Sequence, residues 1–86
     1  MVLGRVEGND LVVQTDLTSR QHAEISYRRG RFHLSDKSSN GTVVETDKGE
    51  LKRLRRESLF LNGRGKICLG GTPEENPEGV IGYSCE

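Results

Sequence analysis

Short apolar stretches separated by glycine-containing turns run through the whole chain of 86 residues, which contains 11 glycines. No window holds an apolar repeat of 3.6 residues long enough for a stable helix. Residues 22–27 alternate instead, with Ala23, Ile25 and Tyr27 on one face. The pattern predicts eight or nine short strands, and many short strands joined by turns are typical of a sandwich or barrel. We therefore expect an all-β fold, an antiparallel β-sandwich.

Two hairpins can be placed from their turn residues. Residues 22–27 pass through Arg29-Gly30 into residues 31–35, and residues 42–44 return through Asp47-Lys48-Gly49 into residues 51–56. Glycine is favoured at such turns because it adopts positive φ at low cost. Other strands are predicted at residues 1–3, 11–13, 59–61, 66–69 and 80–85.

The apolar content limits the chain to one small domain. Hydrophobic residues make up 31% of the sequence, with no tryptophan. A chain of this size buries only about 60–65% of the surface that it exposes when unfolded. Such a core leaves little room for a deep catalytic pocket. Ser19 and His22 lack the surroundings of a catalytic triad, and Gly63-Arg64-Gly65-Lys66 continues into Ile67, which does not fit a phosphate-binding loop. We expect residues 1–86 to form a single domain that is not an enzyme.

The charges balance, with 13 basic and 13 acidic side chains. This balance gives no reason to expect a polyelectrolyte partner. Residues 67–86 hold four acidic and no basic side chains, which leaves residues 1–66 with a net charge of +4. The basic run Lys52, Arg53, Arg55 and Arg56 lacks interleaved aromatics, so we interpret it as a solvated face and expect no nucleic acid partner. No apolar run approaches the roughly 20 residues that span a bilayer. We therefore expect no membrane partner and a cytoplasmic location.

Cys68 and Cys85 lie in alternating apolar stretches and form no short-spaced pair. We interpret both as buried, reduced thiols; a disulfide between neighbouring strands is the alternative. His22 and His33 add only isolated ligands, whereas structural zinc sites use short-spaced pairs. The sequence therefore predicts no metal and no cofactor.

Polar side chains gather where predicted strands end, and loops on a rigid sandwich are where binding residues concentrate. Arg5 and Arg20 supply fork-shaped cationic donors, Ser19 and Ser39 supply hydroxyls, and Asn40 supplies an amide. Together these groups could receive a phosphate dianion, which carries about −1.5 to −2 charges and three acceptor oxygens. Taken singly, Asn40-Gly41 also fits an ordinary hairpin turn.

The order of these motifs resembles that of the forkhead-associated (FHA) domain over nearly the whole chain. The motifs are Gly4-Arg5, Ser19-Arg20-x-His22, Phe32-x-Leu34-x-Asp36, Ser38-Ser39-Asn40-Gly41-Thr42 and Ile67-x-Leu69-Gly70. The resemblance implies a β-sandwich whose loops at one end bind phosphothreonine peptides.

The resemblance also assigns roles to individual residues. Arg5 and Ser19 would contact the phosphate, and Arg20 the phosphate or the peptide beside it. Ser39 would add a hydroxyl, and Asn40 would bind the peptide backbone. The loops would be held in shape by Gly4, His22 and Gly41.

Two finer expectations follow from the same resemblance. Residues 46–57 and 82–86 resemble FHA modules of bacterial adenylate-cyclase-like proteins, which implies a domain from a longer signalling protein. Only Met1, Val2 and Leu3 precede Gly4-Arg5, where the family usually has one or two further strands. We therefore expect an N-terminally short sandwich with exposed edges that could form a homodimer or swap strands. The alternative function is a phosphate-independent interaction module that uses a sandwich face or an exposed edge.

Overall fold

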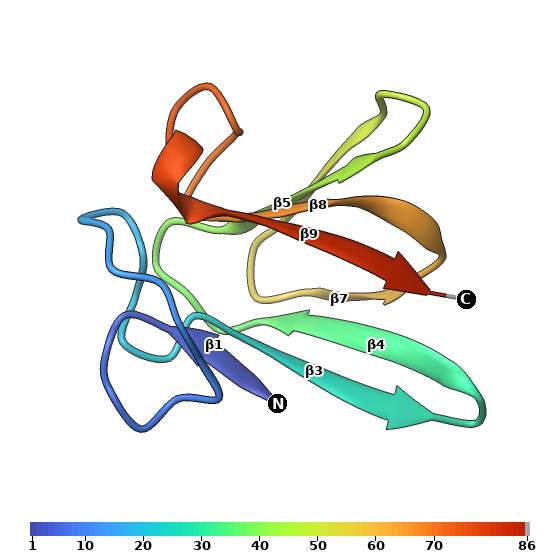
Figure 1. The fold of residues 1–86 in the computed structure, drawn as a ribbon, viewed down its shortest axis with the longest axis horizontal. Coiled ribbons are helices and arrows are strands. Elements are labelled where there is room, and N and C mark those ends of the chain that lie inside the picture. The colour runs from blue at the N-terminus through green and yellow to red at the C-terminus, as the bar shows by residue number, and fades with distance from the viewer. Residues whose placement is uncertain (86) are drawn as a thin grey trace.

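The computed structural model describes residues 1–85 and contains nine strands and one short 3₁₀ turn in that range (Figure 1). The elements are β1 Val2–Gly4, β2 Leu11–Val12, β3 Ala23–Arg28, β4 Arg31–Asp36, β5 Thr42–Thr46, β6 Leu51–Leu54, β7 Ser58–Leu61, β8 Gly63–Leu69, η1 Pro77–Gly79 and β9 Val80–Cys85. The predicted all-β fold is confirmed.

The strands form two sheets that pack face to face. One sheet has the order β2-β1-β3-β4-β7 and the other the order β6-β5-β8-β9. Neighbouring strands are antiparallel except β1 and β2, which are parallel. Figure 1 shows the two layers, with β3 and β4 in one and β5, β8 and β9 in the other.

The core lies between the sheets and is small. Leu3, Leu34 and Leu61 reach it from the five-stranded sheet. Ile67 and Leu69 reach it from the other sheet. All five are at most 4% exposed. Burying one such side chain contributes about 1.5–3 kcal/mol, so this layer holds the sheets together and fixes the loops at their ends.

Both predicted hairpins form. Tyr27 pairs with Phe32 across the first turn, where Arg29 and Gly30 have φ of 52° and 80°. The second hairpin pairs β5 with β6, but β6 ends at Leu54 rather than at the predicted residue 56. The strand stops because the chain turns there, with Arg56 at φ 58° and its backbone N–H donating to the carboxylate of Asp36.

Both described cysteines are free thiols, as predicted. Cys68 is buried, and its Sγ lies 3.2 Å from the carbonyl oxygen of Asn76. Burial and the nearby Glu75 raise the pKa of this thiol. The prediction of a buried Cys85 is wrong, because Cys85 is only partly covered. It lies in β9, the last strand of its sheet, which has a neighbour on one side only among the described residues.

Candidate functional site

Loops from three parts of the chain meet at one end of the sandwich, on the left of Figure 1. They enclose an open hollow of about 580 Å³. Its lining consists of Arg5, Val6, Ser19, Arg20, Gln21, Lys37 and Ser39. Four of the five predicted binding residues therefore lie together, and Asn40 is not part of the lining.

Gly4 allows the first two loops to approach each other. A Cβ atom at this position would collide with the backbone carbonyl oxygen of Arg20. The next residue, Arg5, donates its backbone N–H to the carbonyl oxygen of Ser19 at 3.0 Å. Its Nε donates to the carbonyl oxygen of Thr18 at 3.1 Å. Because this bond at Nε already orients the Arg5 guanidinium, less side-chain conformational entropy is lost when its two NH₂ groups bind a ligand.

His22 is fully buried and joins two of the loops. Its Nδ1 accepts a hydrogen bond from the backbone N–H of Ser19 at 2.9 Å. Nδ1 must therefore be unprotonated, so Nε2 carries the proton and donates to the carbonyl oxygen of Gly41 at 2.8 Å. Burial lowers the pKa of His22, although the bond to Gly41 and the charge of Asp36 act in the opposite direction.

Asp36 is a second buried group beneath the site, 4% exposed. Its Oδ1 accepts bonds from the hydroxyls of Ser38 and Thr42, both at 2.6 Å. Its Oδ2 accepts the backbone N–H of Arg56 at 2.8 Å. Burial by itself would raise the pKa of Asp36, but these hydrogen bonds hold it below its usual value. The carboxylate therefore fixes the loop of residues 37–41 at both of its ends.

Ser39 and Asn40 are carried by that loop. The backbone N–H of Ser39 lies 3.3 Å from Oγ of Ser19 and donates to it, so the two serines are adjacent. Asn40 is exposed, and its Nδ2 donates to the carbonyl oxygen of Leu17 at 3.0 Å. In this arrangement the Asn40 amide bridges two loops with one of its two N–H groups.

Gly41 ends the loop with φ 90°, a backbone conformation that favours glycine. Its N–H donates to Oγ of Ser38 at 2.8 Å, and its carbonyl oxygen receives the bond from His22. Gly4, His22 and Gly41 all lie where these loops approach one another, and their role in shaping a binding site stays a prediction.

The hollow is cationic. Arg5, Arg20 and Lys37 line it, and none of its lining residues is acidic. Lys37 also lies 3.2 Å from the Glu24 carboxylate, but both side chains are about half exposed, and such surface pairs contribute only about 0–1 kcal/mol. A multiply charged anion is the ligand chemistry that this set of donors favours.

Several residues around the hollow were not predicted from the sequence. Val6, Gln21 and Lys37 sit beside the predicted residues in the chain but gave no signal of their own. Asp36 was noted only as part of a motif. Its hydrogen-bond partners, Ser38 and Thr42, lie two and six residues later in the sequence.

Among residues 1–85 no cluster of three or more potential ligands could hold a metal ion. The described part of the chain has no helix long and apolar enough to cross a membrane.

A β-sandwich that presents a cationic hollow on fixed loops belongs to the class of loop-based recognition domains. Residues 1–62 match the family model of the FHA domain, and the chain belongs to this family. No curated protein matches the chain.

Two of the similar solved structures come from Mycobacterium tuberculosis. Rv1747 FHA-1 of Mycobacterium tuberculosis has a TM-score of 0.72 and 23% identity over 98% of this chain and 76% of that chain, which shows the shared fold. Mycobacterium tuberculosis EmbR, solved in complex with a low-affinity phosphopeptide, has a TM-score of 0.65 and 32% identity. That match covers 79% of this chain and 17% of the EmbR chain.

Proposed function

We propose that this FHA domain binds a phosphothreonine-containing segment of a partner protein and serves as a signalling module. The observation that carries the proposal is the hollow in which Arg5, Arg20 and Lys37 converge with no acidic residue in the lining. The complex of EmbR with a phosphopeptide supports the same ligand class.

The donors of the hollow suggest how the phosphate is held. Arg5 is held at Nε and can turn its outer N–H groups to the phosphate oxygens, while Ser19 adds a hydroxyl from the facing loop. Arg20 reaches the phosphate or the peptide beside it, and Ser39 adds a second hydroxyl. Asn40 lies outside the hollow and binds the peptide backbone through its amide. Each hydrogen bond to the charged phosphate contributes about 1.5–3 kcal/mol before ordering costs, which is consistent with roughly micromolar affinity.

Val6 offers a reason for a threonine preference. It is the single apolar side chain among the residues that line the hollow, and it is 37% exposed. The γ-methyl of phosphothreonine can pack on it, whereas phosphoserine leaves this contact empty. An added methyl contributes about 0.8 kcal/mol when buried.

The domain is proposed to work within a longer cytoplasmic signalling protein, similar to the bacterial adenylate-cyclase-like proteins that residues 46–57 and 82–86 resemble. The chain spans only 17% of the EmbR chain, so a domain of this kind occurs there within a much longer protein.

A peptide titration tests the proposal. A degenerate phosphothreonine peptide library is titrated against the chain, with the unphosphorylated library as the reference. We expect saturable binding that requires the phosphate and is nearly lost in Arg5→Ala. Arg28→Ala removes an arginine from the opposite end of β3 and should bind normally. Equal binding of both libraries, or no binding by the folded chain, would overturn the proposal.

A second function is favoured by one observation, the free edge of β9. This strand of six residues contains no charged side chain and pairs only with β8 among the described strands. Uncharged edges invite pairing with another chain, so we propose that this edge can form a homodimer or exchange strands without phosphate. Sedimentation should then show a concentration-dependent dimer that Ser84→Lys, at an exposed position of the edge, abolishes. A chain that stays monomeric at high concentration would contradict it.

A further inference from the structure

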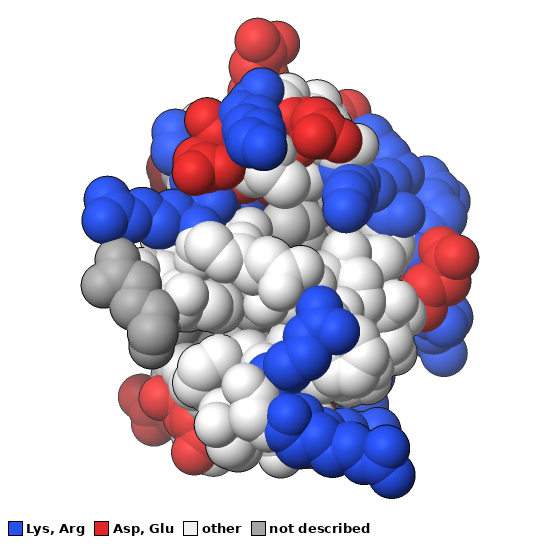
Figure 2. Space-filling view, turned by 90° about the vertical axis from the view of Figure 1, so that its right-hand side faces the viewer, with Lys and Arg blue, Asp and Glu red and all other residues white. Residues whose placement is uncertain are grey.

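The end of the domain opposite the loop site carries a second surface, formed by residues 27–32 and 60–63 and called the distal surface below. Three aromatic side chains are exposed there: Tyr27 at 65%, Phe32 at 40% and Phe60 at 41%. Figure 2 looks onto this end of the molecule and shows an uncharged central area with Lys and Arg side chains along much of its border and Asp or Glu side chains above it, to its right and at its lower left. The strand register places Tyr27 and Phe32 on the core-facing side of the sheet and Phe60, which pairs with His33, on its outer side. Exposed aromatic rings in contact with each other at an uncovered end of a small domain are typical of an interaction site.

Tyr27 and Phe32 are exposed because the core ends before the hairpin does. They pair with each other, and strand alternation places them on the same side as Ile25 and Leu34, which pack in the core. Their rings meet edge to face, with centroids 5.0 Å apart. The core-facing side of the hairpin thus continues past the region that the other sheet covers.

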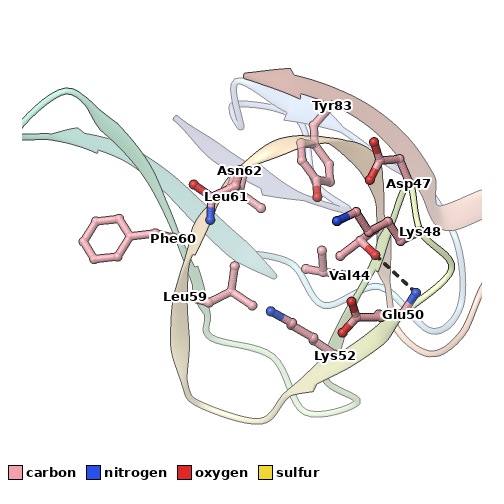
Figure 3. Close-up of a pocket in the computed structure, with 11 residues that line it drawn as sticks. Val44, Asp47, Lys48, Glu50, Lys52, Leu59, Phe60, Leu61, Asn62 and Tyr83 are labelled. Carbon is pink, nitrogen blue, oxygen red and sulfur yellow. Dashed lines mark hydrogen bonds between the residues drawn. The ribbon is translucent and has the colours of Figure 1, made fainter. Parts of the chain in front are cut away.

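Two adjoining hollows lie beside these rings. The smaller, of about 210 Å³, is lined by Tyr27, Phe32, Leu61 and Cys85 among others. The larger, of about 310 Å³, has Val44 and Leu59 at its base, and Tyr83 points into it (Figure 3). Its lining also includes charged side chains of both signs, Asp47, Lys48, Glu50 and Lys52, so the positive charge is confined to the side of the smaller hollow. Leu61 and Asn62 line both. The smaller hollow lies below the lower limit of about 300 Å³ for small-molecule sites and the larger one is close to that limit. The smaller hollow therefore suits a single apolar side chain.

The charge at this surface is positive. Arg28, Arg29 and Arg31 lie within four residues, and residues 25–35 contain no aspartate or glutamate. Arg31 lies over the Phe60 ring at 4.4 Å and donates to Oδ1 of Asn62 at 3.2 Å. Aromatic residues and arginine are enriched in protein–protein interfaces, while lysine, aspartate and glutamate are depleted. The composition therefore favours a protein partner with negative charge.

We propose that the distal surface docks an acidic segment of a partner protein that carries a bulky apolar side chain between its carboxylates. The apolar side chain enters the hollow beside Tyr27 and Phe32. The carboxylates pair with the guanidinium groups of Arg28, the last residue of β3, and Arg29, in the turn that follows, both of which are exposed. This contact is separate from the phosphate site and does not require a phosphorylated ligand.

The two sites lie at opposite ends of the long axis of the domain, which measures 31 Å. An extended chain advances about 3.3–3.6 Å per residue. A partner that occupied both sites would therefore need about ten residues or more between its phosphothreonine and its acidic segment. Such two-site attachment would raise the overall affinity without new contacts at either site.

The test uses an unphosphorylated, fluorescently labelled peptide with one leucine and one phenylalanine between two pairs of glutamates. Binding to the whole chain is followed by anisotropy, and the contact is mapped by amide chemical shifts. We expect saturable binding with shifts confined to residues 27–32 and 59–64. Arg28→Glu with Arg29→Glu should weaken it at least tenfold. The matched control, Arg55→Glu with Lys66→Glu, makes the same charge change elsewhere and should leave it unaltered.

The proposal would be overturned if the labelled peptide did not bind saturably, or if both double variants bound it equally weakly. It would also be overturned if a peptide made of glutamate alone bound as tightly. Tighter binding of oligothymidylate than of the peptide would assign the surface to nucleic acid instead. Phosphopeptide binding by the Arg28→Glu, Arg29→Glu chain should be unchanged, so this test is independent of the one for the phosphate site.

Discussion

The imidazole of His22 accepts the backbone N–H of Ser19 at 2.9 Å, and this bond attaches a residue of the proposed phosphate site to the buried interior of the sandwich. The acceptor atom, Nδ1, is available only while the ring is neutral. Protonation of Nδ1 would turn it into a donor that faces the N–H donor of Ser19, and the imidazole is fully buried. The geometry of the site therefore depends on the charge state of a residue that does not itself line the hollow.

Stability should fall in mild acid because of His22. Burial lowers its pKa in the folded state below the ordinary 6.5. As the pH drops through about 6.5, the unfolded chain takes up this proton first, and the free energy of unfolding decreases until the pH reaches the folded-state pKa. Urea unfolding between about pH 8 and pH 5 measures the slope. His22→Gln should remove much of it, and an unchanged slope in this variant would contradict the assignment.

Phosphopeptide binding should weaken below about pH 6, where the phosphate loses its second negative charge. Arg5 and Arg20 then face a monoanion with one fewer acceptor. Isothermal titration at several pH values measures the effect, and circular dichroism confirms that the chain remains folded. A sulfotyrosine peptide keeps a constant charge and serves as the reference. Constant phosphopeptide affinity from about pH 7.5 to about pH 5 would argue against dianion recognition.

Much of the fold was predictable because the relevant signals are local. Alternation over residues 22–27 and a glycine turn determine the first hairpin, and both belong to a few neighbouring residues. The end of β6 was not predictable, since it depends on a bond between Arg56 and Asp36, twenty residues apart in the sequence. Partial exposure of Cys85 likewise depends on which strand lies at the edge of the sheet.

The residues of the proposed site were brought together only in part as the sequence predicted. The order of motifs identified Arg5, Ser19, Arg20 and Ser39, which the fold brings into one hollow. Asn40 instead donates to the Leu17 carbonyl oxygen, and no sequence spacing indicates that partner. Val6 and Lys37 line the hollow only because three separate loops converge. Convergence of this kind is a tertiary property and leaves no pattern in the chain.

Asp36→Asn should destabilise the domain although it preserves the shape of the side chain. One carboxylate oxygen becomes an NH₂ group. If it replaces Oδ2 it faces the N–H of Arg56, and if it replaces Oδ1 it faces the hydroxyls of Ser38 and Thr42. A buried donor left without an acceptor costs about 1–3 kcal/mol, and urea unfolding at neutral pH should show a loss of this size. Ser35→Ala, which removes an adjacent but half-exposed hydroxyl, should change stability much less. Equal losses in the two variants would contradict the role of Asp36.

The Asp36 carboxylate also predicts a second acid transition. Its folded-state pKa lies below the ordinary 3.8, so its contribution to stability is present above that pH. This contribution is lost as the pH falls below about 3.8 toward the folded-state pKa. Comparison of the wild-type chain with Asp36→Asn across this range should show a difference that shrinks toward low pH. A difference that stays constant would exclude ionisation as its source.

Val6→Ala should reduce the preference for phosphothreonine over phosphoserine. Loss of packing on the γ-methyl is worth about 0.8 kcal/mol, which is about a fourfold change in the affinity ratio. The two peptides differ only in that methyl, so their ratio is insensitive to general weakening of the site. Val12→Ala, an exposed valine outside the lining, is the matched control. An unchanged ratio in Val6→Ala would place the methyl contact elsewhere.

Arg56 has a left-handed backbone conformation, and its side chain forms a hydrogen bond to the loop that carries Ser39. Two substitutions separate the cost of the backbone conformation from the contribution of that hydrogen bond. The φ of Arg56 is 58°, and its Nε donates to the carbonyl oxygen of Ser38 at 3.1 Å, next to Ser39. Arg56→Ala loses the bond and keeps the strain, whereas Arg56→Gly loses the bond and relieves the strain.

The left-handed conformation costs a non-glycine residue about 1–2 kcal/mol. Arg56→Gly should therefore unfold at higher urea than Arg56→Ala. Both variants should bind phosphopeptide more weakly than the wild-type chain, because neither can form the hydrogen bond from Arg56 Nε to the carbonyl oxygen of Ser38. If the glycine variant were the less stable of the two, the strain would not be the dominant effect at this turn. If both bound peptide normally, the Arg56 side chain would have no part in positioning Ser39.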